Sequence, residues 1–263
     1  MPELPDVEVV KQYADATSLH QKVQAVRVGE RRMLEGVSAE ELASRLEGHI
    51  FEATQRHGKY LFLGLDDANW LMLHFGMTGD LKYFKDPDKK PEYEQLLIDF
   101  SNGYHLAYDA PRKLGKIGMV EDIGSFVKEK GLGPDVMKSS FDFGTFQDTV
   151  AGRRAMLKTT LMDQRLMAGI GNVYSDEILF QTRVHPRTQI NQLGEQKLEE
   201  VFHTMKEVLQ TAIDCRADPD QFPSSYLIPQ RYEGGKCPNC GGEVGKLKIS
   251  GGTAYYCSNC QRE

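Results

Sequence analysis

Residues 237–260 contain the most informative stretch of this chain: Cys237-Pro238-Asn239-Cys240, sixteen further residues, and Cys257-Ser258-Asn259-Cys260. Each Cys-x2-Cys pair lets two thiolates converge on one ion from a tight turn, and tetrahedral sulfur coordination favours zinc. Because the protein supplies all four ligands, no coordination position stays open for catalysis. The spacing therefore predicts a zinc-ribbon hairpin with one structural Zn²⁺, bound by Cys237, Cys240, Cys257 and Cys260.

The cysteines are confined to the last part of the 263-residue chain, whose only other cysteine is Cys215. Such clustering indicates a metal site in a reducing compartment, and we expect a cytoplasmic protein, associated with the nucleoid if the source is prokaryotic. Cys215 ends a helical pattern and is expected to be a small buried apolar residue. The chain has no run of 18 apolar residues and no amino-terminal signal pattern, which excludes a membrane span and a secretory signal.

Upstream of the ribbon, the hydrophobic period changes twice. Helical spacing in residues 1–15 gives way to a β-rich region, interpreted as a sandwich or barrel, with the segments Val23–Val28, Tyr60–Leu65, Trp70–Phe75, Leu96–Phe100 and His105–Tyr108. Helical spacing returns in Leu157–Asp163, Val173–Phe180 and Lys197–Ile213, and a loop rich in proline, glycine and serine follows at 216–236. We expect an α+β multidomain fold with boundaries at 1–130, 131–226 and 227–263.

The amino terminus contains the one pattern suited to covalent catalysis. Pro2 follows Met1, and removal of Met1 would leave a secondary amine at the chain end. Such an amine attacks aldehyde carbons to form a cationic iminium, and an α-amino group, with a pKa of about 7.7–8.0, is partly neutral at pH 7. Glu3 could move the protons. The simpler interpretation is a helix start, where proline and an acidic residue are both common.

The order of several motifs along the chain strengthens the catalytic interpretation. The opening Met-Pro-Glu-Leu-Pro-Asp-Val-Glu resembles that of the formamidopyrimidine-DNA glycosylase/endonuclease VIII family. The same resemblance continues through Arg56-His57-Gly58-Lys59-Tyr60, His74-Phe75-Gly76-Met77-Thr78-Gly79, Gly169-Ile170-Gly171-Asn172-Val173-Tyr174 and the four-cysteine ribbon. It implies an amino-terminal helix with a β-sandwich, a helix-two-turn-helix domain and a zinc-ribbon hairpin, in a monomer that binds damaged double-stranded DNA.

The resemblance also implies roles for single residues. Pro2 is expected to attack C1′ of the damaged nucleoside, Glu3 to act as acid and base, and Lys59 to lie near the lesion phosphate. The residues that fill the space left by a flipped nucleotide are expected to be Met77, Arg112 and Leu114, with leucine where an aromatic wedge is usual. Phosphate contacts are expected from Arg154, Lys158 and Asn172. By themselves, Lys59 would be an exposed turn lysine, Met77 a core residue and Arg112 a surface charge.

Charge distribution agrees with a DNA partner better than net charge does. The whole chain carries −6, whereas residues 151–170 hold four basic residues and one acidic residue. One departure concerns the ribbon, where Gly252 stands at the position of the arginine that many family members place at the hairpin tip. Lys246 or Lys248 could replace only its charge, because lysine lacks the guanidinium fork.

The sequence-based interpretation is a bifunctional DNA glycosylase and AP lyase that excises oxidised purines or formamidopyrimidines. It would act through a Pro2 Schiff base followed by β-elimination. One rival is a DNA-damage binding protein of the same fold, with catalysis weakened by Gly252 or by a retained Met1. A second is an oxidised-pyrimidine glycosylase of the endonuclease VIII type, and a third is an unrelated zinc-ribbon interaction protein.

Overall fold

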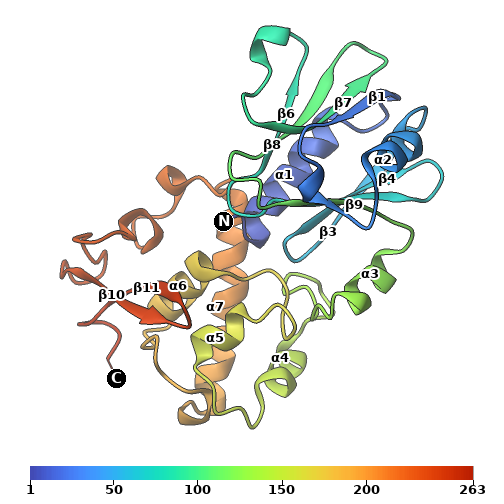
Figure 1. Ribbon diagram of the computed structural model, residues 1–263. Coiled ribbons are helices and arrows are strands. Elements are labelled where there is room, and N and C mark those ends of the chain that lie inside the picture. Colours follow the sequence, from blue (N-terminus) through green and yellow to red (C-terminus); the bar gives the residue numbers. More distant parts are fainter. Residues whose placement is uncertain (263) are drawn as a thin grey trace. The chain divides into compact units, whose positions relative to one another are not determined.

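The computed structural model describes residues 1–262 and separates into two compact units. The first contains Met1–Pro2 and Asp6–Lys130, and the second contains Glu3–Pro5 and Gly131–Glu263. Figure 1 shows both units, with helices and strands labelled where there is room. Among the described residues, no helix combines the length and the apolar character that crossing a membrane would require.

The first unit is built from two β-sheets, together with α1 (Leu4–Thr17), α2 (Ala39–Leu46) and α3 (Ile123–Glu129). Its strands are β1 (Val23–Val28), β2 (Leu34–Glu35), β3 (Phe51–His57), β4 (Tyr60–Leu65), β5 (Trp70–His74), β6 (Asp80–Phe84), β7 (Glu94–Phe100), β8 (His105–Asp109) and β9 (Lys116–Val120). One sheet has the order β1-β7-β8-β6 and the other β2-β9-β5-β4-β3. Only the short β2–β9 pair is parallel among these strands.

Both sheets contribute one face to a shared apolar core, which confirms the expected sandwich. Leu61 and Leu63 of β4 belong to this core. Phe62, between them, instead lies edge-on to Phe126 of α3, with ring centroids 5.5 Å apart. Both faces of β4 are therefore covered, which explains why its sequence is apolar without alternation.

The first unit also contains a helix within the region expected to be β-rich. α2 begins with a capping box in which Glu41 N–H donates to Ser38 Oγ and Ser38 N–H donates to the Glu41 carboxylate. Its apolar side, Leu42 and Leu46, is fully buried. The Ser-x-x-Glu spacing was a signal for this helix start, although eight residues give too short a period to separate it from strands.

The second unit consists of four helices and a carboxy-terminal hairpin: α4 (Phe143–Val150), α5 (Leu157–Met162), α6 (Asn172–Gln181), α7 (Glu195–Asp214), β10 (Val244–Ile249) and β11 (Gly252–Cys257). The expected helices correspond to α5, α6 and α7, whereas α4, capped by Asp142, was not expected. The predicted loop at 216–236 contains two short 3-10 turns, Pro219–Gln221 and Ile228–Gln230. Cys215 caps α7 and is half-buried, with its thiol 3.2 Å from the Gln221 carbonyl.

Helix α6 is the central element of the second unit and packs against α5, α7 and β11. Its side chains from Tyr174 to Phe180 are all buried, including three polar ones, Ser175, Asp176 and Glu177. Buried polar groups require hydrogen-bond partners. The partners of these three side chains and of the turn before α6 define most of the candidate site.

Candidate functional site

The turn before α6 holds the carboxylate of Glu3 in a fixed position. Glu3 is 1% exposed, and it accepts hydrogen bonds from the backbone N–H groups of Gly171 (2.6 Å), Val173 (2.8 Å) and Tyr174 (3.3 Å). α6 has no side-chain cap at its own amino-terminal residue, Gly171. Glu3 therefore satisfies N–H groups that a helix start leaves unpaired, and the helix dipole favours its negative charge there.

Two glycines leave the space that the Glu3 carboxylate needs at this turn. A Cβ at Gly171 would come within 2.4 Å of the Glu3 carboxyl group, and one at Gly169 would overlap the Leu4 side chain at the same distance. Gly169 also has a φ of +127°, and its carbonyl accepts a hydrogen bond from Leu4 N–H at 3.0 Å. The Gly-Ile-Gly-Asn turn thus leaves room for the side chains of Glu3 and Leu4, and a side chain at either glycine would occupy that space.

Pro2, the candidate nucleophile, directly precedes Glu3 in the chain. It is half-buried, and Met1 before it is 51% exposed. Glu3 is anchored through its side chain, which fixes the position of the residue that follows Pro2.

Lys59 occupies the two-residue turn Gly58-Lys59 between β3 and β4, where Gly58 adopts a φ of +55°. Its side chain is only 7% exposed, unlike that of an ordinary turn lysine. Its ammonium group acts on His74: burial, then the positive charge of Lys59, lowers the pKa of that imidazole to about 4. The structure thus places a cation in a confined environment within the first unit.

The expected space-filling residues lie on two touching loops of the first unit. Met77 is 38% exposed and Leu114 is 53% exposed, so neither is a core residue. A Cβ at Gly76 would come within 2.6 Å of the Leu114 backbone, which shows how closely the loops approach each other. Arg112 is exposed on the second loop. Apolar side chains held outward on adjacent loops can enter a base stack.

Lys158, which was expected to contact phosphate, is buried in this structure. It is 1% exposed, and its Nζ lies 2.7 Å from Asp176 Oδ1 and 2.6 Å from Ser175 Oγ. It also donates to the Asn172 carbonyl at 3.3 Å. Burial lowers the pKa of Lys158, and the facing Asp176 carboxylate opposes that shift. The charge of Lys158 is therefore paired inside the unit, and the surface of residues 151–170 is less basic than their composition indicates.

Asp176 connects three segments that lie far apart in the sequence. Besides Lys158, its carboxylate accepts hydrogen bonds from Arg231 Nε at 2.8 Å and from Tyr255 N–H at 3.1 Å. The Arg231 guanidinium also lies over the Tyr255 ring, 4.8 Å from its centroid. Sequence reasoning did not select Asp176 or Arg231, although an acidic residue within an otherwise apolar helix was a usable signal.

Asn172, the first residue of α6, is joined to the hairpin. Its Nδ2 donates to the Thr253 carbonyl of β11 at 2.8 Å. The hairpin tip is a two-residue turn, Ser250-Gly251, with positive φ at both positions. Gly252 therefore begins β11 without a side chain, where an arginine was expected. The nearby lysines are engaged: Lys248 bonds Thr253 Oγ1, and Lys246 pairs with Glu233.

Glu177 is a second buried carboxylate on α6, which sequence reasoning also missed. It is fully buried and accepts hydrogen bonds from the backbone N–H groups of Leu227 (3.1 Å) and Ile228 (2.8 Å). Gln181 Nε2 adds a third at 2.7 Å and also donates to the Ser225 carbonyl. Burial raises the pKa of Glu177 to about 7 despite these hydrogen bonds. It fixes the middle of the 216–236 loop to α6.

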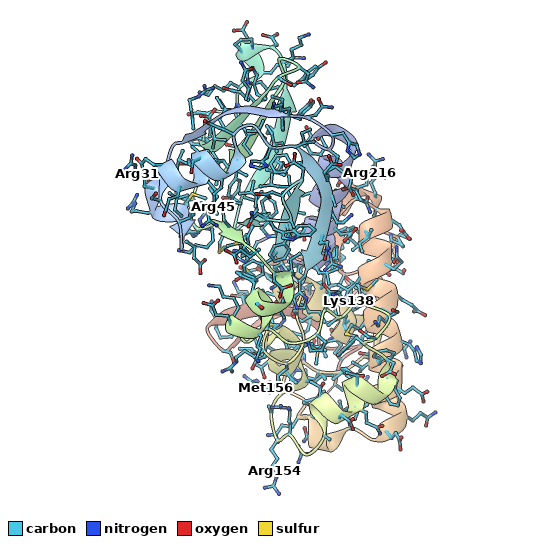
Figure 2. The ribbon with its side chains drawn as sticks, turned by 90° about the vertical axis from the view of Figure 1, so that its right-hand side faces the viewer. Arg31, Arg45, Lys138, Arg154, Met156 and Arg216 are labelled. Atoms are coloured by element: carbon cyan, nitrogen blue, oxygen red, sulfur yellow. The ribbon has the colours of Figure 1, made fainter. Side chains whose placement is uncertain are left out.

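Arg154 is exposed, and Figure 2 shows its side chain extending away from the ribbon. It lies between α4 and α5, only four residues before the buried Lys158. Of the two basic residues expected here as phosphate contacts, Arg154 is thus the one that solvent can reach.

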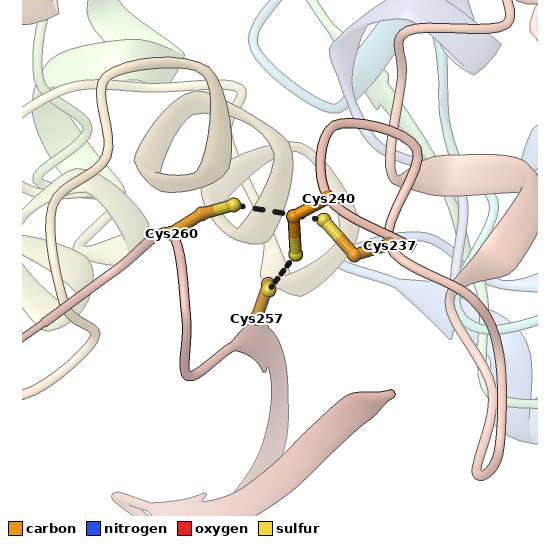
Figure 3. Close-up of side chains that lie close together, drawn as sticks. All are labelled: Cys237, Cys240, Cys257 and Cys260. Carbon is orange, nitrogen blue, oxygen red and sulfur yellow. Dashed lines mark hydrogen bonds between the residues drawn. The ribbon is translucent and has the colours of Figure 1, made fainter. Parts of the chain in front are cut away.

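The four ribbon cysteines converge from two segments, as Figure 3 shows. All four sulfur atoms lie within 4.8 Å of one another, with Sγ–Sγ distances of 3.8 Å for Cys237 and Cys260 and 3.5 Å for Cys240 and Cys257. Tetrahedral Zn–S bonds of about 2.3 Å place sulfurs about 3.8 Å apart. The residues present therefore fit a tetrathiolate metal centre, with Cys237 and Cys257 buried.

Comparison with protein families gives two matches. The model of the formamidopyrimidine-DNA glycosylase N-terminal domain matches residues 1–117, and that of the H2TH domain of the same enzymes matches residues 132–223. A formamidopyrimidine-DNA glycosylase of Streptococcus pyogenes serotype M6 is 31% identical, with 100% of this chain and 99% of the relative covered. One of Protochlamydia amoebophila is 28% identical over the whole of both chains.

Solved structures of similar proteins were obtained with DNA. The formamidopyrimidine-DNA glycosylase of Lactococcus lactis, noncovalently bound to DNA with an AP site, superposes with a TM-score of 0.88 at 28% identity and covers 99% of this chain. A complex of the Lactococcus lactis protein with DNA containing FAPY-dG gives a TM-score of 0.90, also at 28% identity and 99% coverage. Each match extends over 100% of the solved chain.

Proposed function

We propose that this chain, which belongs to the formamidopyrimidine-DNA glycosylase family, excises oxidised purines or formamidopyrimidines from double-stranded DNA and then cleaves the backbone as an AP lyase. The observation that carries the proposal is the buried Glu3 carboxylate. It is fixed by three backbone N–H groups and directly follows the residue that becomes the amino terminus. A positioned carboxylate beside an amine is the minimum requirement for imine chemistry with proton transfer.

The chemical steps use only these two groups. After removal of Met1, the Pro2 nitrogen attacks C1′ and the bond from C1′ to the base breaks, with the electron pair leaving on the base. Glu3 takes the proton from the Pro2 nitrogen and delivers it to the sugar ring oxygen as the ring opens. The product is an iminium between Pro2 and C1′. The Glu3 carboxylate, free again, then removes a C2′ proton, and the C–H electron pair enters the iminium to give an enamine. The enamine expels the 3′-phosphate as the C3′–O bond breaks, which is β-elimination.

Residues of both units are proposed to bind DNA. The confined ammonium group of Lys59 would contact the phosphate at the lesion, where a partly desolvated charge acts more strongly than in water. Met77, Leu114 and Arg112 would fill the space left by the flipped nucleotide. Arg154 would contact phosphate, and Asn172 would contact phosphate at the end of the turn that precedes α6. Phosphate contacts make binding sensitive to salt.

Lys158 is proposed to hold the turn before α6 in place and not to contact DNA directly. Its Nζ contacts the Asn172 carbonyl and Asp176, which also holds the hairpin. Zn²⁺ is proposed for the four cysteines, with a structural role, because no ligand position is left for substrate. It would stabilise a hairpin that has little core of its own.

Borohydride trapping tests the proposal on one preparation. Protein that retains Met1 is mixed with duplex DNA containing a single abasic site and sodium borohydride, before and after treatment with methionine aminopeptidase. Intact mass gives the fraction that has lost Met1. We expect the fraction of protein trapped on DNA to follow the fraction with a free Pro2, because only that amine can form the iminium.

Two results would contradict the mechanism. Equal trapping before and after treatment would assign the imine to a lysine side chain. No trapping in either sample, together with salt-sensitive binding to the same DNA, would favour a damage-binding protein without lyase activity. Gly252 is the observation that supports such a protein, because it leaves the hairpin tip without an arginine.

A further inference from the structure

A cavity of about 470 Å³ lies within the second unit, between the segment after α6 and the start of α7. None of its lining residues has a role in the proposed reaction. Its size falls in the range of small-ligand sites, about 300–1,000 Å³. It is lined by Arg183, Val184, His185, Arg187, Thr188, Gln189, Gln192, Leu193, Lys197 and Arg262.

The lining is strongly positive for a chain of net charge −6. Four of the lining side chains carry permanent positive charge, and no aspartate or glutamate occurs among the described residues that form the wall. Arg183, Arg187 and Arg262 are exposed at its surface. One guanidinium group can bind two phosphate oxygens at once, which favours phosphate over other anions. Lys197 is partly neutralised, since its Nζ lies 2.6 Å from Glu200.

The start of α7 lies beside the cavity. Leu193 lines the cavity just before the capping residue Gly194, and Lys197 stands in the first turn. Gly194 provides no side-chain cap, and α7 is 20 residues long. The amino terminus of such a helix carries a partial positive charge and N–H groups without intrahelical partners. Glu195, also in this turn, offsets that charge, and residues 194–196 do not line the cavity, so its basic side chains are the anion-binding groups.

The wall of the cavity is held in place by its neighbours. Thr188 accepts a backbone hydrogen bond from Leu157 N–H at 3.0 Å, and Ile190 donates to the Ala155 carbonyl at 3.0 Å. The His185 ring lies edge-on to Tyr256, with centroids 5.0 Å apart, and its Nδ1 accepts from Arg187 N–H at 3.3 Å. A preformed wall reduces the entropy lost when a ligand binds.

We propose that this cavity is a phosphate-binding site, distinct from the proposed catalytic residues. Its ligand is a phosphate-bearing anion, either a free polyphosphate or a phosphodiester of DNA. Both sources share the oxyanion chemistry that arginine guanidinium groups recognise.

Arg183 and Arg216 form a matched pair for testing the proposal. Each is exposed and follows the cap of a helix, α6 and α7 respectively, with nearly the same backbone conformation, φ of +55° and +54°. Only Arg183 lines the cavity. Figure 2 labels Arg216 beyond the carboxy-terminal end of α7. Arg183→Gln and Arg216→Gln therefore remove the same charge from the same local geometry.

The first arm uses inorganic pyrophosphate and the full-length protein without DNA. Isothermal titration at low salt should show saturable binding to wild type and to Arg216→Gln. Binding to Arg183→Gln should be weaker by roughly tenfold to a hundredfold, as expected for one charged hydrogen-bonding partner. Arg262→Gln gives a second variant in case Arg183→Gln alters the thermal midpoint relative to Arg216→Gln.

The second arm measures the salt dependence of binding to undamaged duplex DNA. If a DNA phosphodiester occupies the cavity, the slope of log K against log salt should decrease by about one in Arg183→Gln, and not in Arg216→Gln. An effect in the first arm alone identifies a free polyphosphate as the ligand, and an effect in the second identifies DNA. If both arginine variants match each other in both arms, the proposal is overturned.

Discussion

Glu3 and Glu177 are both buried carboxylates that accept backbone N–H groups, yet they stand in opposite electrostatic settings. Glu3 accepts from the first turn of α6, at Gly171, Val173 and Tyr174. Glu177 lies inside the same helix and accepts from Leu227 and Ile228 of a loop. One carboxylate is placed against a helix by a distant segment, and the other belongs to the helix and anchors a distant segment.

A helix start and a loop offer N–H groups to a carboxylate in different electrostatic settings. A helix start combines unpaired N–H groups with the positive end of the dipole, so it favours an anion. The helix interior offers no such field, and two loop N–H groups with one amide do not balance the cost of burial. The pKa of Glu177 accordingly rises to about 7. Glu3 thus binds the N–H groups of a helix start, whereas Glu177 holds a loop through a carboxyl group whose pKa is raised.

Removal of the metal should have the largest effect, because it should unfold the hairpin and leave the contacts of Glu3 and Glu177 in place. The hairpin hydrogen-bonds to α6 at Asn172 and Asp176, and Phe180 of α6 packs in one apolar cluster with Val244 and Cys257. Zinc binding can supply on the order of 10 kcal/mol of folding free energy to such modules. After chelation, the amides of residues 244–257 should exchange rapidly in hydrogen-exchange measurements, while those of residues 171–174 stay protected.

Cys215→Ser is the matched control for metal removal, since this cysteine lies outside the four-sulfur cluster. It should retain one metal ion per chain, whereas Cys257→Ser should lose it. Equal loss of protection at 171–174 and 244–257 would show that the hairpin, and not Glu3, holds the start of α6.

Glu3→Gln should have the next largest effect, and it tests directly the role of the negative charge at the start of α6. The amide keeps the size of the side chain but lacks the charge and turns an N–H₂ group toward N–H donors. Single-turnover base excision should decrease by about 10²- to 10⁴-fold. Unfolding free energy should decrease by about 1–3 kcal/mol. Exposed Glu40→Gln serves as the control, and a change of less than threefold in excision would exclude Glu3 from proton transfer.

Glu177→Gln should have the smallest effect on base excision, because its effect should be confined to the pH dependence of stability. The folded pKa of about 7 lies above the ordinary value of 4.5, so between these values the folded state binds more protons than the unfolded state. Stability from this group is complete below pH 4.5 and is lost as pH rises through 7. The stability of Glu177→Gln relative to wild type should therefore increase by about 3 kcal/mol from pH 4.5 to 7.5.

Urea unfolding at several pH values measures this difference, with exposed Glu207→Gln as the control. A difference between variant and wild type that stays constant with pH would mean that Glu177 remains ionised when buried. In that case the contrast between the two carboxylates would be one of position alone.

Local patterns predicted most of the elements and missed those whose signals were mixed. Tyr60–Leu65 is an uninterrupted apolar run and forms β4 with the same bounds. β3 alternates irregularly between exposed and buried residues and was not recognised. α2 lies among strands and was missed although Ser38 and Glu41 form a capping box. A hydrophobic pattern over only a few residues does not distinguish a helix from a strand, and tertiary packing determines which one forms.

For the candidate site, the sequence by itself determined the chemical groups: the four cysteines, Pro2 beside Glu3, and the glycines of Gly169-Ile170-Gly171. Their spacing limits what they can do, because ligand geometry and backbone space are local properties. The tertiary structure decided which charges reach solvent. It buried Lys158 against Asp176, joined Arg231 to α6, and gave Glu177 a loop to hold. Burial and partners across long sequence separations set electrostatic energies, and no local pattern contains them.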